Sequence, residues 1–298
     1  MMKPMKKRIA FIINPISGTG DRKRLPDIIQ KNLDLAQFEH RILFTTKAGD
    51  GTRLAAECVD EKLDAVVAVG GDGTMNEIAK SLIHTDTALG LIPAGSGNGL
   101  ARHLNIPINI AKAIQLLNRS EAIKIDYGLV NEKPFFCTCG TGFDAYVSME
   151  FAKAKKRGVM TYLEKMVSSY RNYKLQTYHL MGEGIDFNNK AFLITFANAS
   201  QWGNNAYIAP QASVQDGLLD VSVMSNFPDI AIPTVLLQLF TKNIHNDLFV
   251  NTFRAKEVTL IREASGPFHR DGEPYEEGKK ISIKIVKEGL NVLVKKRF

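Results

Sequence analysis

The sequence predicts an α/β domain with a parallel sheet over residues 1–127 and an antiparallel β-sandwich domain over residues 128–287. Up to about residue 126, short β-branched runs alternate with helical patterns, whereas beyond it strand-like runs follow one another with few helices between them. With 298 residues, 45% hydrophobic and 23% charged, the composition is that of a globular protein and excludes a disordered chain. The tail at about 288–298 is expected to pack back on the first domain.

The α/β class of the first domain is predicted from its strands and from the helical stretches between them. Strands are predicted at residues 8–13, 40–45, 64–69 and 87–92. Apolar residues recur at helical spacing within the stretches 25–33, 53–63, 75–83 and 109–117. Such alternation requires crossover connections, so the sheet is expected to be parallel and covered by helices on both faces.

The second domain is predicted from a succession of strands. They are expected at residues 123–130, 134–139, 176–187, 190–198, 218–224, 254–262, 281–286 and 290–295. The pair Asn188-Asn189 predicts a hairpin turn. Two helices interrupt the strands, one within 144–173 and one near 229–241.

Charge and cysteine content limit the class of protein further. The net charge of +7 favours anionic partners. Because the chain shows no nucleic-acid-binding motif, we do not expect nucleic acid to be one of them. Three cysteines are an odd number in a long chain and indicate a reducing compartment. The apolar run at 230–240 is too short to span a bilayer, so we expect a cytoplasmic protein.

Three glycine-rich loops follow predicted strands of the first domain. They read NPISGTG at 14–20, GGDGT at 70–74 and PAGSGNG at 93–99, and none of them is a Walker A sequence. The carboxyl ends of parallel strands meet at one edge, where open α/β sheets bind ligands. Glycine lets the backbone approach a ligand, and the helix that follows offers N–H groups to phosphate. The sequence therefore predicts a phosphate site at this edge.

Asp72 is unusual within such a loop. A carboxylate beside a phosphate is repulsive unless a cation or a proton intervenes. Asp72 therefore implies either a bridging Mg²⁺ or a hydrogen bond from its own helix N-terminus. Because Thr74, Asn76 and Glu77 follow it, we favour a functional role over a simple turn.

The loops together resemble the diacylglycerol kinase catalytic domain superfamily, which includes sphingosine and ceramide kinases. The resemblance rests on VGGDGTMNE at 69–77 and PAGSGNGLA at 93–101, preceded by NPISGTG. It continues in the family's order with GTGFDAYV at 140–147, DGLLDV at 216–221 and DGE at 271–273. Bacterial relatives commonly have Asp where this chain has Gly99, so a sphingoid base or ceramide stays open beside diacylglycerol as the acceptor.

The resemblance implies a lipid kinase that uses ATP and Mg²⁺, with ATP between the two domains. Asp271 would be the general base that accepts the proton of the lipid hydroxyl, beside Asp72 and Mg²⁺, with Glu273 as the second candidate. A structural Mg²⁺ site would use Asp216 and backbone carbonyls near Ser213 and Leu218. The residues implied for nucleotide binding are Asn14, Thr45, Gly70, Gly71, Asp72, Gly73, Thr74, Asn76, Glu77, Ser96 and Asn98.

Alternatives remain for the function and for the partners. An NAD kinase shares the GGDG loop, and a non-catalytic lipid- or nucleotide-binding relative is the second alternative. The basic run Lys153, Lys155, Lys156 and Arg157 predicts either a solvated helix face or a transient contact with an anionic membrane surface. A homodimer is left open.

Overall fold

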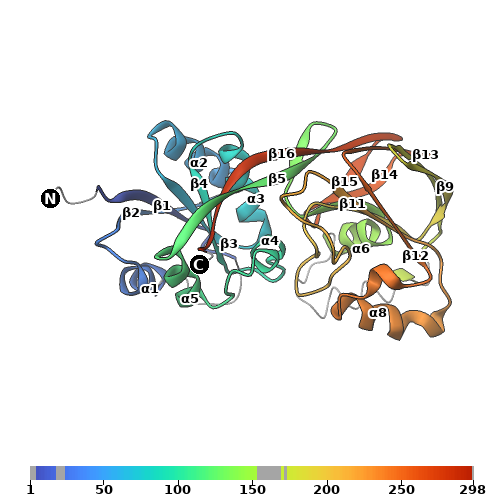
Figure 1. Cartoon of the computed structure of the whole chain (residues 1–298), viewed down its shortest axis with the longest axis horizontal. Helices are drawn as coiled ribbons and strands as arrows, with labels where there is room; N and C mark the ends of the chain where they lie inside the picture. Colours follow the sequence, from blue (N-terminus) through green and yellow to red (C-terminus); the bar gives the residue numbers. More distant parts are fainter. Residues whose placement is uncertain (1–4, 18–23, 153–168, 171–172, 297–298) are drawn as a thin grey trace. The chain divides into compact units, whose positions relative to one another are not determined.

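The computed structural model describes residues 5–17, 24–152, 169–170 and 173–296, and it divides into two units (Figure 1). Unit 1 consists of Met1–Asp126 and Lys287–Phe298, and unit 2 is Tyr127–Val286. The chain passes between the units within two of its strands, β5 (Ser120–Val130) and β16 (Lys280–Lys295).

Unit 1 is built on a parallel sheet with the strand order β2-β1-β3-β4, which confirms the predicted class. Its strands are β1 (Lys7–Ile13), β2 (Phe38–Phe44), β3 (Ala65–Gly70) and β4 (Ala88–Pro93). Every residue of β3 and β4 is buried, as expected for strands covered on both faces. The end of β16 joins this sheet beside β4, where Val292 pairs with Leu89 in parallel.

Helices cover both faces of this sheet (Figure 1). On one face α2 (Asp50–Asp60) packs against α3 (Asp72–Leu82), and on the other α1 (Leu25–Asn32) packs against α5 (Ile110–Leu117). The short helix α4 (Gly99–His103) follows the loop after β4. The two loops that precede α3 and α4 therefore leave the sheet from neighbouring strands.

Unit 2 is an antiparallel β-sandwich, as predicted. One sheet has the order β12-β11-β10-β7-β14-β15, and the other contains β9, β8, β13 and β16, while β5 forms a hairpin with β6. The strands of the first sheet are β7 (Thr138–Gly142), β10 (Leu193–Ala197), β11 (Leu219–Met224), β12 (Val250–Ala255), β14 (Gly266–Arg270) and β15 (Glu273–Glu277). The remaining strands are β6 (Lys133–Phe135), β8 (Gln176–Gly182), β9 (Ile185–Ala191) and β13 (Glu257–Arg262).

Two apolar clusters hold unit 2 together. The first lies between the sheets and includes Phe196 and Phe268 from one sheet and Leu260 from the other, all fully buried. The second covers the first sheet's other face with α6 (Phe143–Ala152), the 3₁₀ turns η2 (Asp229–Ala231) and η3 (Ile244–Asn246), and α8 (Ile232–Phe240). Burial of large apolar side chains on both faces is the main stabilising contribution.

The predicted hairpin turn at Asn188-Asn189 was wrong. The chain turns at Glu183-Gly184, since Gly182 pairs with Ile185, and both asparagines lie in β9. Gly184 has φ +72°, a left-handed conformation that glycine adopts without steric cost. The stretch 134–139 divides into β6 and β7 and the stretch 254–262 into β12 and β13, whereas 281–286 and 290–295 belong to the single strand β16.

Candidate functional site

The loops predicted to bind phosphate meet at the carboxyl edge of the unit 1 sheet. Asn14, directly after β1, donates from Nδ2 to Oγ1 of Thr74 in the first turn of α3, at 3.1 Å. The loops after β3 and β4 are joined by hydrogen bonds of Asp72, described below. Residues 18–20 of the first loop lie outside the described part of the chain.

Glycine is required where the second and third loops touch. A Cβ on Gly95 would lie 2.3 Å from Cα of Gly71, so the two backbones are in direct contact. A Cβ on Gly70 would lie 2.5 Å from Oγ1 of Thr74. Because Cβ atoms essentially never approach other atoms this closely, the glycines at these positions are fixed by packing.

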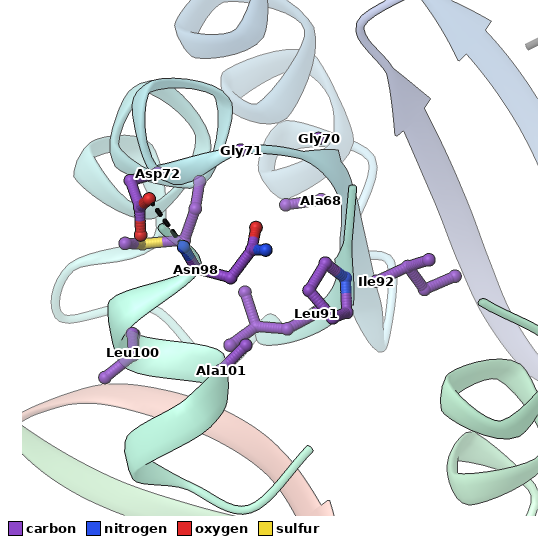
Figure 2. Close-up of a pocket in the computed structure, with 11 residues that line it drawn as sticks. Ala68, Gly70, Gly71, Asp72, Leu91, Ile92, Asn98, Leu100 and Ala101 are labelled. Carbon is purple, nitrogen blue, oxygen red and sulfur yellow. Dashed lines mark hydrogen bonds between the residues drawn. The ribbon is translucent and has the colours of Figure 1, made fainter. Parts of the chain in front are cut away.

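Asp72 joins the start of α3 to the start of α4. Its Oδ2 accepts the N–H of Asn98 at 2.8 Å (Figure 2). Its Oδ1 accepts the N–H of Gly99 at 2.7 Å. Burial raises the pKa of Asp72, and these two N–H donors act in the opposite direction. The sequence predicted either a bridging Mg²⁺ or a hydrogen bond from the aspartate's own helix, whereas Asn98 and Gly99 lie at the start of the neighbouring helix.

Asn98 completes the third loop. It has a left-handed backbone with φ +53°, and its side chain both accepts from N of Gly95 and donates to O of Gly95. Asparagine is among the residues that tolerate this conformation. Ser96, at the tip of the same loop, is exposed.

A small cavity lies beneath these loops. Its lining includes Gly71, Asp72, Asn98 and Leu100 (Figure 2). With a volume of about 20 Å³, it has room for about one water molecule. Residues of both loops line this space.

The other predicted nucleotide residues of unit 1 differ in their surroundings. Asn76 is buried, and its Oδ1 has no hydrogen-bond partner in the described part of the chain. Glu77 instead accepts the N–H groups of Gly49 and Gly51 at the start of α2. Thr45 is buried at the end of β2, and its N–H bonds to O of Ile13.

Asp271 of unit 2 lies in a tight turn. Arg270 pairs with Glu273, so Asp271 and Gly272 form the two-residue connection between β14 and β15, with φ of +48° and +80°. Glu273, the second candidate base, begins β15 and is exposed.

The carboxylate of Asp271 also anchors the chain just before β7. Its Oδ2 accepts the N–H of Phe136 at 2.9 Å, and its Oδ1 accepts those of Cys137 at 2.7 Å and Thr138 at 3.0 Å. The N–H of Asp271 in turn donates to O of Thr138 at 2.7 Å. Three N–H donors therefore fix the position and the direction of this carboxylate.

A buried pair beside this turn was missed by sequence reasoning. Nε2 of His269 in β14 lies 2.9 Å from Oδ2 of Asp144 in the first turn of α6, and both side chains are almost fully buried. The pair connects α6 to the strand that leads into the turn at Asp271. Asp144 does lie within the GTGFDAYV motif, but its partner is 125 residues away in the sequence.

At the predicted cation site, a positively charged side chain already contacts Asp216. Oδ1 of Asp216 accepts the N–H of Leu218, and Oδ2 pairs with the guanidinium of Arg254, which also lies 3.5 Å from Asp220. Burial raises the pKa of Asp220 to about 6, while Arg254 lowers it and Asp216 raises it. The oxygen Oγ of Ser213 accepts from N of Gln215.

These contacts do not favour a divalent ion as the partner of Asp216, because a guanidinium already neutralises the carboxylate. No group of three metal-ligating side chains occurs in the ranges that the structure describes. A structural cation held by Asp216 and carbonyls near Ser213 and Leu218 therefore stays a prediction.

Thermal unfolding with and without Mg²⁺ tests this site. Without nucleotide, millimolar Mg²⁺ is expected to raise the melting temperature of Arg254→Gln more than that of the wild-type protein, because the change frees Asp216 for a cation. Arg53→Gln, which removes an exposed ion pair in unit 1, serves as the control. A rise in the melting temperature of the wild type would show that Mg²⁺ binds despite Arg254.

The basic run at Lys153, Lys155, Lys156 and Arg157 lies outside the described residues, and its predicted membrane contact stays a prediction. In the described ranges, no helix has both the length and the apolar composition that crossing a bilayer requires.

Comparison with known proteins agrees with this organisation. Residues 8–130 match the model of the diacylglycerol kinase catalytic domain, and residues 137–294 match that of the YegS C-terminal NAD kinase β-sandwich-like domain. A diacylglycerol kinase structure from Bacillus anthracis has the same fold, with a TM-score of 0.73 at 20% identity and 97% of each chain covered.

Two curated relatives are named as probable YegS-like lipid kinases. The protein from Yersinia enterocolitica is 28% identical over 263 residues, which cover 86% of this chain and 87% of that protein. The one from Pectobacterium atrosepticum is 30% identical over 237 residues, covering 77% of this chain and 78% of that protein. With both domains matched in order, this chain belongs to the family of YegS-like probable lipid kinases that carry a diacylglycerol kinase catalytic domain.

Proposed function

We propose that this protein is an ATP-dependent kinase that transfers the γ-phosphate to the hydroxyl of a lipid, either diacylglycerol or a sphingoid-type lipid. The observation that supports this most is the pair of glycine loops held together by Asp72, in a chain that belongs to a lipid kinase family. Phosphoryl transfer depends on positioning and charge neutralisation, which loops fixed in this way can supply.

Unit 1 would hold the nucleotide, with Mg²⁺ entering as part of the metal–nucleotide substrate. Gly71 and Gly95, where the two loops touch, carry no side chain that could stand between their backbone and a ligand. In this proposal Asp72 acts through the loops, because its carboxylate oxygens accept N–H groups of the protein.

Unit 2 would supply the base. Asp271 would accept the proton of the lipid hydroxyl as the hydroxyl oxygen bonds to the γ-phosphorus and the β–γ bridging oxygen leaves with ADP. The three N–H donors from residues 136–138 fix the direction of the carboxylate. Glu273 remains the second candidate.

A transfer assay with γ-labelled ATP tests the proposal. The acceptors are diacylglycerol, monoacylglycerol, a sphingoid base, ceramide and NAD, each offered with Mg²⁺. We expect label in a lipid product and none in NAD. Labelled NADP would show an NAD kinase, and no transfer to any acceptor would support a non-catalytic binding protein.

A further inference from the structure

Helix α8 of unit 2 carries exposed apolar side chains on the side that faces away from the core. Val235 and Leu239 are buried against the second cluster and fix the orientation of the helix. The exposed residues within α8 are Leu236 (42%), Leu237 (63%) and Phe240 (57%), and Ile230 (88%) lies in η2 directly before the helix; we call these four residues the α8 face. Residues 230, 237 and 240 follow the i, i+7, i+10 spacing of one helix side.

The α8 face has no charge of its own. No Asp, Glu, Lys or Arg occurs from Ile230 to Thr241; Asp229, directly before this run, accepts a hydrogen bond from the hydroxyl of Tyr170, and Lys242 follows the helix. Nζ of Lys242 lies 4.5 Å from the ring centroid of Tyr207, whose N–H donates to O of Leu239. Uncharged apolar side chains bordered by tyrosine and lysine are typical of segments at the boundary between membrane and water.

The α8 face is small. A stable protein–protein interface uses about 20–30 residues on each side. The α8 face offers four large apolar side chains. Contact with lipid has no such minimum, because its strength scales with the apolar area that is buried.

We propose that the α8 face inserts into the headgroup–acyl boundary of a lipid bilayer and holds the protein there reversibly. The inference rests on the proposed function, since the acceptor of a lipid kinase resides in a bilayer. Figure 1 shows α8 at the outer edge of unit 2, where nothing in the described part of that unit covers its exposed side. The contact is apolar, so it does not depend on anionic lipids.

Sedimentation with phosphatidylcholine vesicles tests the surface without requiring turnover. The double variant Leu237→Gln/Phe240→Gln keeps helix-compatible side chains and is expected to bind vesicles at least tenfold more weakly than the wild type. Met181→Gln is the matched control, because Met181 is exposed at 37% but lies in β8. Met181→Gln is expected to bind vesicles within twofold of the wild type. Raising NaCl from about 0.1 to 0.5 M is expected to change the vesicle binding of the wild type less than twofold.

Three results would overturn the proposal. They are unchanged vesicle binding by the double variant, wild-type binding that appears only with phosphatidylserine, and a wild-type dimer that becomes a monomer in the double variant, which would show an interface between copies. A companion assay with a short-chain, water-soluble diacylglycerol is expected to give equal turnover for the wild type and for the double variant. If no lipid is phosphorylated but vesicle binding still depends on Leu237 and Phe240, the proposed function fails while the surface stands.

Discussion

Replacing Asp271 with asparagine is expected to lower phosphoryl transfer by about 10²–10⁴-fold, the usual contribution of a positioned general base. Asparagine is the suitable replacement because it tolerates the left-handed conformation that Asp271 adopts at φ +48°. The KM for ATP is expected to change little, because the glycine loops proposed to hold the nucleotide belong to unit 1.

Asp271→Asn is also expected to lower stability. The asparagine side chain has one acceptor oxygen, whereas the carboxylate receives N–H groups from Phe136, Cys137 and Thr138 on two oxygens. A buried donor left without its acceptor costs about 1–3 kcal/mol, so the melting temperature should fall measurably. Turnover must therefore be measured well below the new melting temperature.

Glu273→Gln is the matched control for this variant. Glu273 is two residues away and exposed, so the change removes a nearby charge without affecting the turn. It is expected to keep turnover within a few fold of the wild type. Near-normal turnover in folded Asp271→Asn would exclude Asp271 as the base, and a large loss in Glu273→Gln would assign that role to Glu273.

Replacing Gly95 with alanine is expected to abolish most nucleotide binding and to destabilise unit 1. The new Cβ would lie 2.3 Å from Cα of Gly71, and a backbone atom cannot move aside as the end of a flexible side chain can. The loops must separate, which weakens the bonds from Asn98 and Gly99 to Asp72. Overpacking of this kind costs about 1–3 kcal/mol.

Calorimetric titration with an ATP analogue and thermal unfolding measure the two effects. We expect at least a tenfold loss of affinity and a lower melting temperature. Gly278→Ala is the control, because a Cβ at Gly278 meets no atom within 4 Å. Wild-type affinity and stability in Gly95→Ala would show that the two loops are not held together by this contact.

The sequence predicted the strands of unit 1 to within about two residues because their burial determines their composition. The run AVVAVG of β3 is apolar throughout, which only a strand covered on both faces would require. The hairpin between β8 and β9 was misplaced because Asn188-Asn189 and Glu183-Gly184 are both acceptable turns from local preference alone. Only the pairing of the strands distinguishes them.

Contacts between distant residues were not accessible from the sequence. The bond between Asp144 and His269 joins residues 125 apart, and Asp216 meets Arg254 across 38 residues. Spacing arguments reach only neighbours on one helix or strand. For Asp72 the motif predicted either a bridging Mg²⁺ or a hydrogen bond from its own helix, but it gave no indication of the donors at the start of α4.

The link that Asp72 makes between α3 and α4 has a consequence for thermodynamic additivity. Because one carboxylate fixes the first residues of both helices, the loops before them form a single mechanical unit. Substitutions in the two loops should therefore show energetic coupling, with a second change costing less affinity than it would alone. A preference for one nucleotide over another would then be a property of the joined pair, which neither loop determines by itself.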